Sequence, residues 1–119
     1  MVYVVDSKNC RVQKFTPNGQ FVLMWGSRGT GDGQFQTGDW GYGPRGIAVG
    51  PQGYIYVADR YNHRIQKFAA DGKFACKWGS YGSGAEQFNE PMGLAVDKYD
   101  YVFVADSRNY RTEVFESAG

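Results

Sequence analysis

The feature that most constrains the fold is an internal repeat. One twelve-residue pattern occurs three times, as VVDSKNCRVQKF, VADRYNHRIQKF and VADSRNYRTEVF. Its aspartates, Asp6, Asp59 and Asp106, are 53 and 47 residues apart. Units repeated at such a period bury their apolar faces against one another instead of forming separate cores. The sequence therefore predicts a row of similar units.

A single insertion explains why the two spacings differ. The segment WGSRGTGDGQFQ (residues 25–36) aligns with WGSYGSGAEQFN (residues 78–89). The first copy then adds TGDWGY (residues 37–42) before GPRGIAV realigns with EPMGLAV. The unit without the insertion is therefore 47 residues long, a length that suits one blade of a β-propeller.

Each unit divides into four short strands, named a to d in chain order. The copies are GIAV and GLAV for strand a, YIYVAD and YVFVAD for strand b, RVQKF, RIQKF and RTEVF for strand c, and FVLMW and FACKW for strand d. Strand b is apolar without clear alternation, as expected when both faces of a sheet are covered. No segment has a helical period, and the 17 glycines fit many turns. We predict an all-β protein.

Short turns connect the strands. GPQG and DKYD separate strands a and b, whereas Asn18-Gly19 and Asp71-Gly72 separate strands c and d. Asn-Gly and Asp-Gly favour two-residue hairpins in which both central residues have positive φ. Asn9, Asn62 and Asn109 lie between strands b and c, where we expect residues that tolerate positive φ.

The phase of the repeat predicts an incomplete set of strands. The chain opens at a strand b, so residues 1–119 hold strands bcd, abcd and abc as one propeller segment. The expected divisions are a partial first blade at 2–25, a link with the insertion at 26–45, a full blade at 46–78, a link at 79–92 and a partial third blade at 93–116.

These motifs resemble the NHL-repeat family of β-propellers. The resemblance rests on P-x-G-[IL]-A-V, on [IV]-[YF]-V-[AV]-D-x-x-N-x-R, and on Q-K-F followed by W-G and G-x-G-x-x-Q-F. It covers the chain except the insertion, and the third copy departs from it at Thr112, Glu113 and Val114. The resemblance implies four-stranded blades, most often six in a ring. It also implies that strand a lines the channel and that the b–c and d–a loops share one face.

An open row of blades leaves one apolar flank uncovered at each end. Such flanks favour association. We expect the chain to form a homo-oligomer, and two copies would close a six-bladed ring. Five repeats shared by two chains with exchanged strands, and an excerpt of a longer polypeptide, remain alternatives.

The motif that occurs three times is predicted to have a structural role and not to form a repeated active site. Asp and Arg flank the b–c connection at a spacing that lets them pair across the two strands. A residue that is present in every blade is expected to stabilise the structure that all blades share. The expected structural pairs are Asp6 with Arg11, Asp59 with Arg64, and Asp106 with Arg111.

The residues give little support to catalysis, metal binding or a cofactor. His63 is the only histidine. The family that the chain resembles includes an amidating lyase whose zinc ion is held by several histidines, and a single histidine cannot supply such a site. Cys10 and Cys76 lack the spacing of a zinc or redox pair, and the glycine-rich GTGDGQF lacks the rest of a P-loop. We expect a non-enzyme with no catalytic, cofactor-binding or metal-binding residues.

Charge and hydropathy restrict the partners. The formal net charge of +1 gives no general attraction to nucleic acid or anionic membrane. No apolar run is long enough for a membrane span, and no signal-peptide pattern is present. We expect a soluble protein without a membrane partner, and nothing indicates its compartment.

Function should then lie in what differs between the copies. The candidate ligand face combines the b–c tips with the insertion: Trp40, Tyr42, Arg45, Lys8, Arg60, Tyr61, His63, Arg108 and Tyr110. Trp40 and Tyr42 on a glycine-flexed loop suit a recognition hot spot, unless Trp40 packs into a neighbouring blade. We expect binding of a protein or peptide, or an assembly role. Single-stranded RNA binding, which the resemblance also implies, and a fragmentary or engineered piece without a ligand are alternatives.

Overall fold

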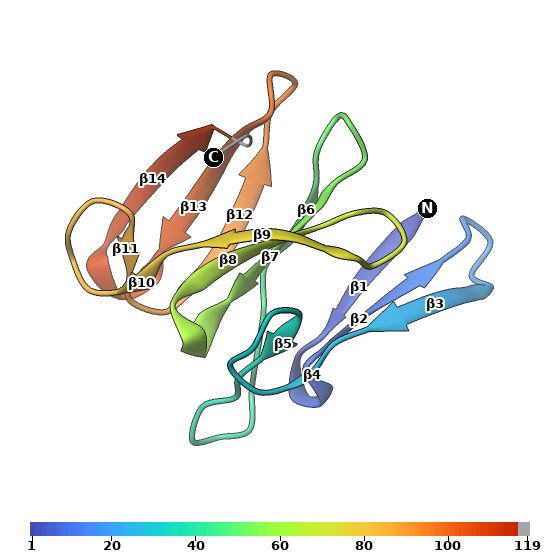
Figure 1. The fold of residues 1–119 in the computed structure, drawn as a ribbon, viewed down its shortest axis with the longest axis horizontal. Helices are drawn as coiled ribbons and strands as arrows, with labels where there is room; N and C mark the ends of the chain where they lie inside the picture. Colours follow the sequence, from blue (N-terminus) through green and yellow to red (C-terminus); the bar gives the residue numbers. More distant parts are fainter. Residues whose placement is uncertain (117–119) are drawn as a thin grey trace.

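The computed structural model describes residues 1–116 and contains three main antiparallel sheets arranged in an arc (Figure 1). Each sheet joins strands that are consecutive in the chain. The first is β1 (Val2–Asp6), β2 (Arg11–Phe15) and β3 (Phe21–Trp25); the second is β6 (Ile47–Val49), β7 (Ile55–Asp59), β8 (Arg64–Phe68) and β9 (Phe74–Trp78); the third is β12 (Pro91–Val96), β13 (Tyr101–Asp106) and β14 (Arg111–Glu116). The all-β class and the strand order bcd, abcd, abc are confirmed.

The links between sheets contain additional strands that the sequence did not predict. β4 (Ser27–Arg28) pairs in parallel with β5 (Gln34–Phe35), and β10 (Ser80–Tyr81) pairs with β11 (Gln87–Phe88). Each pair closes a compact loop at the periphery of the arc (Figure 1). Pairs of two residues carry no readable hydrophobic period, which explains why they were missed.

The core lies between neighbouring sheets and consists of two clusters. The first cluster joins Val12 of β2 to Ile55 and Val57 of β7, with Phe35 from the link. The second joins Tyr56 and Ala58 of β7 to Val102 and Val104 of β13, with Phe88 from the link. All five residues of β7 are buried, because both faces of this sheet are covered. β13 instead alternates between exposed and buried residues.

The hairpins between strands c and d differ from the expectation. Gly19 and Gly72 have φ of 91° and 88°, but Asn18 and Asp71 do not have positive φ. In the first hairpin, Gly19 N–H donates to the Thr16 carbonyl, and Thr16 N–H donates to the Gln20 carbonyl. Ala69, Gly72 and Lys73 repeat this pattern in the second hairpin. This is a three-residue loop with one left-handed position, so the expectation of two positive φ values was wrong.

The connections between strands b and c also differ from the expectation. Each is a short 3-10 turn: η1 (Ser7–Asn9), η2 (Arg60–Asn62) and η3 (Ser107–Asn109). The left-handed residue is the one after each asparagine, namely Cys10, His63 and Tyr110. The asparagine side chains instead donate to the preceding aspartates, at 3.0, 2.9 and 2.7 Å. The asparagines therefore serve as hydrogen-bond donors and not as positive-φ residues.

Candidate functional site

The three repeated Asp–Arg pairs form ion pairs at the base of the b–c hairpins. The Nε–Oδ2 distances are 2.8 Å for Arg11–Asp6, 2.8 Å for Arg64–Asp59 and 3.1 Å for Arg111–Asp106. Their burial differs strongly, because the Arg64 side chain is 8% exposed and the Arg11 side chain is 34% exposed. One motif therefore occupies two different dielectric environments.

The pKa values of the aspartates follow this difference. Hydrogen bonds from Asn9 and Arg11 lower the pKa of Asp6. Burial raises the pKa of Asp59, while hydrogen bonds from Asn62 and Arg64 act in the opposite direction. The central pair thus combines a large desolvation cost with nearly complete hydrogen bonding.

Arg64 also fixes the link that precedes its own blade. Its guanidinium donates to the carbonyl oxygens of Thr30, Gly31 and Gln34, all at 2.8 to 2.9 Å. Arg111 makes the equivalent contacts with the carbonyls of residues 83, 84 and 87. The arginine therefore joins a hairpin to the link between blades, which gives the repeated motif a structural role.

The insertion forms a tight turn. Gly38 N–H donates to the Tyr42 carbonyl at 2.9 Å, and Gly41 N–H donates to the Gly38 carbonyl at 3.0 Å. Gly41 has a φ of 79°. This is the hydrogen-bond pattern of the c–d hairpins, so the segment forms a hydrogen-bonded turn. Trp40 lies at its tip and is 85% exposed.

Contacts with two b–c tips hold this turn in place. Gly43 N–H donates to Ser7 Oγ at 2.9 Å, and Lys8 Nζ lies 4.8 Å from the centre of the Tyr42 ring. On the other side, a side chain at Gly38 would collide with the ring of Tyr61. Arg28 donates to Thr37 Oγ1 at the start of the insertion. The structure thus brings Lys8, Trp40, Tyr42 and Tyr61 into one neighbourhood.

A second cluster of the expected residues is organised by Glu90, which the sequence did not single out. Its carboxylate accepts hydrogen bonds from Arg60 at 3.1 Å and from Arg108 at 3.2 Å. Its backbone N–H donates to His63 Nδ1 at 3.0 Å. Burial lowers the pKa of His63, although the carboxylates of Glu90, Asp59 and Asp106 act in the opposite direction. His63 therefore belongs to the junction between blades.

The remaining expected face residues are solvent-exposed. Arg45 is exposed and follows the insertion in the chain. Tyr110 is 93% exposed at the third b–c tip. The only sequence signal for Glu90 was its place in EPMG, where the other copy has Gly43. Glu90 has a positive φ of 56°, whereas Gly43 does not. A side chain at Gly43 would instead collide with the carbonyl oxygen of Ser7, so the two positions differ in conformation.

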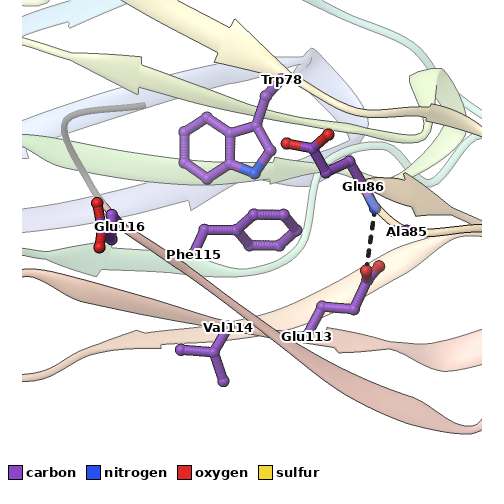
Figure 2. Close-up of a pocket in the computed structure, with 7 residues that line it drawn as sticks. All are labelled: Trp78, Ala85, Glu86, Glu113, Val114, Phe115 and Glu116. Atoms are coloured by element: carbon purple, nitrogen blue, oxygen red, sulfur yellow. Dashed lines mark hydrogen bonds between the residues drawn. The ribbon is translucent and has the colours of Figure 1, made fainter.

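A pocket of about 440 Å³ lies outside this loop face, beside β14. Figure 2 shows the indole of Trp78 next to the ring of Phe115, with Glu116 on one side of the two rings and Glu86 and Glu113 on the other. Glu113 Oε1 accepts a hydrogen bond from the Glu86 N–H at 3.1 Å. Neither Phe115 nor Trp78 was expected as a site residue, because both match repeated core positions.

The NHL repeat model matches residues 42–68, which include the Asp59–Arg64 hairpin. The chain is 39% identical over 66 residues to RING finger protein nhl-1 of Caenorhabditis elegans. The matched region is 56% of this chain and 6% of that protein. Residues 42–68 therefore contain an NHL repeat.

A second relative is named as an enzyme. This NHL-repeat chain is 38% identical over 68 residues to peptidyl-glycine alpha-amidating monooxygenase A of Xenopus laevis. That match covers 53% of the chain and 7% of the relative. The NHL-repeat chain thus spans less than a tenth of each of these two relatives.

Solved structures support the fold. A Bacteroides thetaiotaomicron VPI-5482 protein superposes with a TM-score of 0.73 at 20% identity, over 96% of this NHL-repeat chain and 32% of the other chain. At that identity the likeness concerns the fold alone. The NHL-repeat chain spans about a third of that structure.

The described residues contain neither a cluster of metal-ligating side chains nor a helix that could span a membrane. Within residues 1–116, no group of three or more histidine, cysteine, aspartate or glutamate side chains is placed to hold a metal ion. The same residues include no helix with the length and apolarity to cross a bilayer. Cys10 is buried, and Cys76 is partly buried.

Proposed function

We propose that the chain is a non-enzymatic scaffold that binds a protein or peptide through the face formed by the b–c and d–a loops. The observation that carries the proposal is Trp40, 85% exposed at the tip of an ordered turn. Large aromatic residues dominate binding energy at protein interfaces. A turn whose backbone is already hydrogen-bonded loses less conformational entropy when a partner is bound.

The neighbours of Trp40 complete an amphipathic surface. Tyr42 is exposed, and Lys8 lies over its ring. Tyr61 lies against the turn on the opposite side. A peptide with an apolar side chain and a carboxylate would meet both kinds of group here. The non-enzymatic part is supported by His63, whose Nδ1 already accepts a hydrogen bond from the backbone of Glu90.

The RNA alternative has weaker support. A surface that follows a phosphate backbone needs several uncompensated cations. Arg60 and Arg108 both pair with Glu90, so two of the three cationic side chains at the b–c tips are compensated. Lys8 is left near Tyr42. We therefore rank protein or peptide binding first.

Selection from a displayed random-peptide library against the full chain tests the proposal. Selected peptides should bind the wild type and lose about tenfold or more affinity for Trp40→Ala. Tyr99→Ala is the matched control, because Tyr99 is 70% exposed but lies in the turn between β12 and β13. Peptides that bind Trp40→Ala as tightly as the wild type would contradict the proposal.

A titration with random single-stranded RNA at two salt concentrations separates the two ligand classes. The proposal expects only weak binding at moderate salt. Tight binding that falls steeply with salt would reverse the ranking, because it reports the release of counterions from phosphates.

We also propose that copies of the chain associate through the two end flanks. On the first sheet, Val2, Val4 and Met24 are exposed apolar residues. On the last sheet, Phe103 is exposed beside a hollow of about 260 Å³. The corresponding flank of the middle sheet is buried by its neighbour. Two copies joined in this way would complete a six-bladed ring.

A further inference from the structure

A pocket of about 220 Å³ lies between two turns of the middle sheet, the β6–β7 turn and the β8–β9 hairpin. Figure 1 shows both turns on the side of the arc opposite to the insertion. The pocket is therefore separate from the Trp40 face. Its lining residues are Gln52, Gly53, Tyr54, Ala69 and Ala70.

Hydrogen bonds fix the backbone of both turns. In the β6–β7 turn, Gly53 N–H donates to the Gly50 carbonyl at 3.0 Å, and Gly50 N–H donates to the Tyr54 carbonyl at 2.9 Å. In the β8–β9 hairpin, Ala69 N–H donates to the Lys73 carbonyl at 2.8 Å. The walls of the pocket are thus formed before a ligand binds, which reduces the entropy that binding costs.

The size and the lining of the pocket suit a single aromatic side chain. Its volume is below the roughly 300–1,000 Å³ of pockets that enclose small-molecule ligands. Ala69 and Ala70 supply methyl groups, and Tyr54 supplies an aromatic residue that is 36% exposed. A Cβ added at Gly53 would meet no atom within 4 Å, so the space beside this glycine is open. A flat ring can pack against methyl groups and against another ring.

Two ammonium groups lie beside the pocket, one next to each turn. Lys14 of the first sheet donates from Nζ to the Ala70 carbonyl at 2.9 Å. Lys67 Nζ lies 4.3 Å from the centre of the Tyr54 ring. The two cations come from different sheets and contact opposite walls of the pocket. A ligand in the pocket therefore has a positive charge close to it on both sides.

The acidic residues of the nearby turns do not line the pocket. Asp71 Oδ1 accepts a hydrogen bond from Lys73 N–H at 3.0 Å. Asp100 belongs to the β12–β13 turn, and its Oδ1 would lie 3.0 Å from a Cβ added at Gly50. Neither aspartate is among the lining residues. The charges around the pocket favour a ligand with a carboxylate next to its ring.

We propose that this pocket is a docking site for a partner polypeptide that presents an aromatic side chain next to aspartate or glutamate. The ring enters between the two turns and packs against Tyr54 and Ala70. The neighbouring carboxylate pairs with Lys14 or Lys67. This site does not depend on the function proposed for the Trp40 face.

Selection of displayed random peptides against the Trp40→Ala chain isolates this site, because the loop face has then lost its most exposed aromatic residue. We expect selected peptides with phenylalanine, tyrosine or tryptophan beside an acidic residue. Ala70→Phe places a ring in the pocket and should weaken their binding about tenfold or more. Selection of no binder, or equal binding to the Ala70→Phe chain, would overturn the proposal.

Pro17→Phe is the matched control for that substitution. Pro17 occupies the equivalent position of the hairpin between β2 and β3, and both Pro17 and Ala70 are exposed, so neither change disturbs the core. The Pro17→Phe chain should bind the selected peptides as tightly as its parent. An equal loss in both variants would mean that the added ring, and not the filled pocket, causes the effect.

The charge contact has a separate test. Lys14→Gln removes the cation, keeps a hydrogen-bond donor, and should weaken an acidic peptide about threefold or more. It should not affect the same peptide with its carboxylates replaced by amides. Lys98→Gln is the control, because Lys98 is exposed in the β12–β13 turn and should not matter. Equal effects of the two substitutions would contradict the proposed pairing.

Nuclear magnetic resonance locates the peptide independently of affinity. Binding should shift the methyl resonances of Ala69 and Ala70, which line the pocket, but not that of Ala85 in the link between β10 and β11. Shifts concentrated in residues 37–42 would place the peptide on the loop face and refute a site between the two turns.

Discussion

Arg64 donates a hydrogen bond from Nε to Oδ2 of Asp59 at 2.8 Å, and both residues are buried between sheets. Asp59 also accepts hydrogen bonds from the backbone of Gln36 and from the side chains of Asn62 and Gln66. Such a pair gives little net stability when intact, but removal of one partner leaves a buried charge.

Removal of the arginine should therefore have effects that depend on burial. We expect Arg64→Ala to lower the free energy of unfolding by about 3–5 kcal/mol, because Asp59 then lacks its cation. Arg11→Ala should cost no more than about 1 kcal/mol, because its ion pair is solvent-accessible. Urea denaturation followed by circular dichroism measures both. Equal losses would show that burial does not govern the motif.

His63 should make stability fall at mildly acidic pH. Burial lowers the pKa of folded His63 below its ordinary value of 6.5, so the unfolded chain binds a proton first. The contribution of His63 to stability is then complete above pH 6.5, and it falls as the pH drops from 6.5 to the folded pKa. The imidazole resonances of this single histidine report the folded pKa directly.

A matched variant isolates that effect. His63→Asn keeps a residue that tolerates the left-handed φ of 52°, and its amide oxygen replaces Nδ1 as acceptor for Glu90 N–H. The decline in unfolding free energy below pH 6.5 should be smaller in this variant. A folded His63 pKa at or above 6.5 would be incompatible with the buried, accepting imidazole.

Fluorescence quenching should separate Trp40 from the other two tryptophans. Trp40 is 85% exposed, whereas Trp25 and Trp78 are partly buried against Phe68 and Phe115. We expect Trp40→Phe to remove most of the emission that acrylamide quenches easily. Its unfolding free energy should change by less than about 0.5 kcal/mol. Unchanged quenching would mean that Trp40 is covered in solution.

Self-association should respond to a charge placed on either end flank. Val4→Glu and Phe103→Glu each put a carboxylate on an exposed apolar surface. We expect light scattering after size exclusion to give an oligomer for the wild type and monomers for both variants. Tyr99→Glu, in an exposed turn, is the control and should remain oligomeric. A monomeric wild type at micromolar concentration would argue against association through the flanks.

Most of the fold could be read from the repeat. The ten strands of the three main sheets, their order and the all-β class follow from copies that align residue by residue. The turn geometry was less accessible, because Asn-Gly and Asp-Gly occur in two-residue and three-residue hairpins alike. The left-handed positions fell on Cys10, His63 and Tyr110, which have no shared side chain to mark them.

The candidate sites were only partly predictable. The insertion attracted attention to Trp40 because it breaks the repeat. Glu90 was not recognised as the common partner of Arg60 and Arg108, since pairing between loops of different blades leaves no periodic signal. The pocket at Phe115 was not predicted, because Phe115 and Trp78 match repeated core positions.

The sequence by itself determined the blade, because alternating apolar residues and turn signals act over a few neighbouring positions. Only the tertiary structure decided the environment of each copy. Arg11 and Arg64 belong to the same motif, yet one is partly exposed and the other is enclosed by a link and two sheets. Burial depends on which elements lie on either side, and that is a property of the assembled arc and not of the motif.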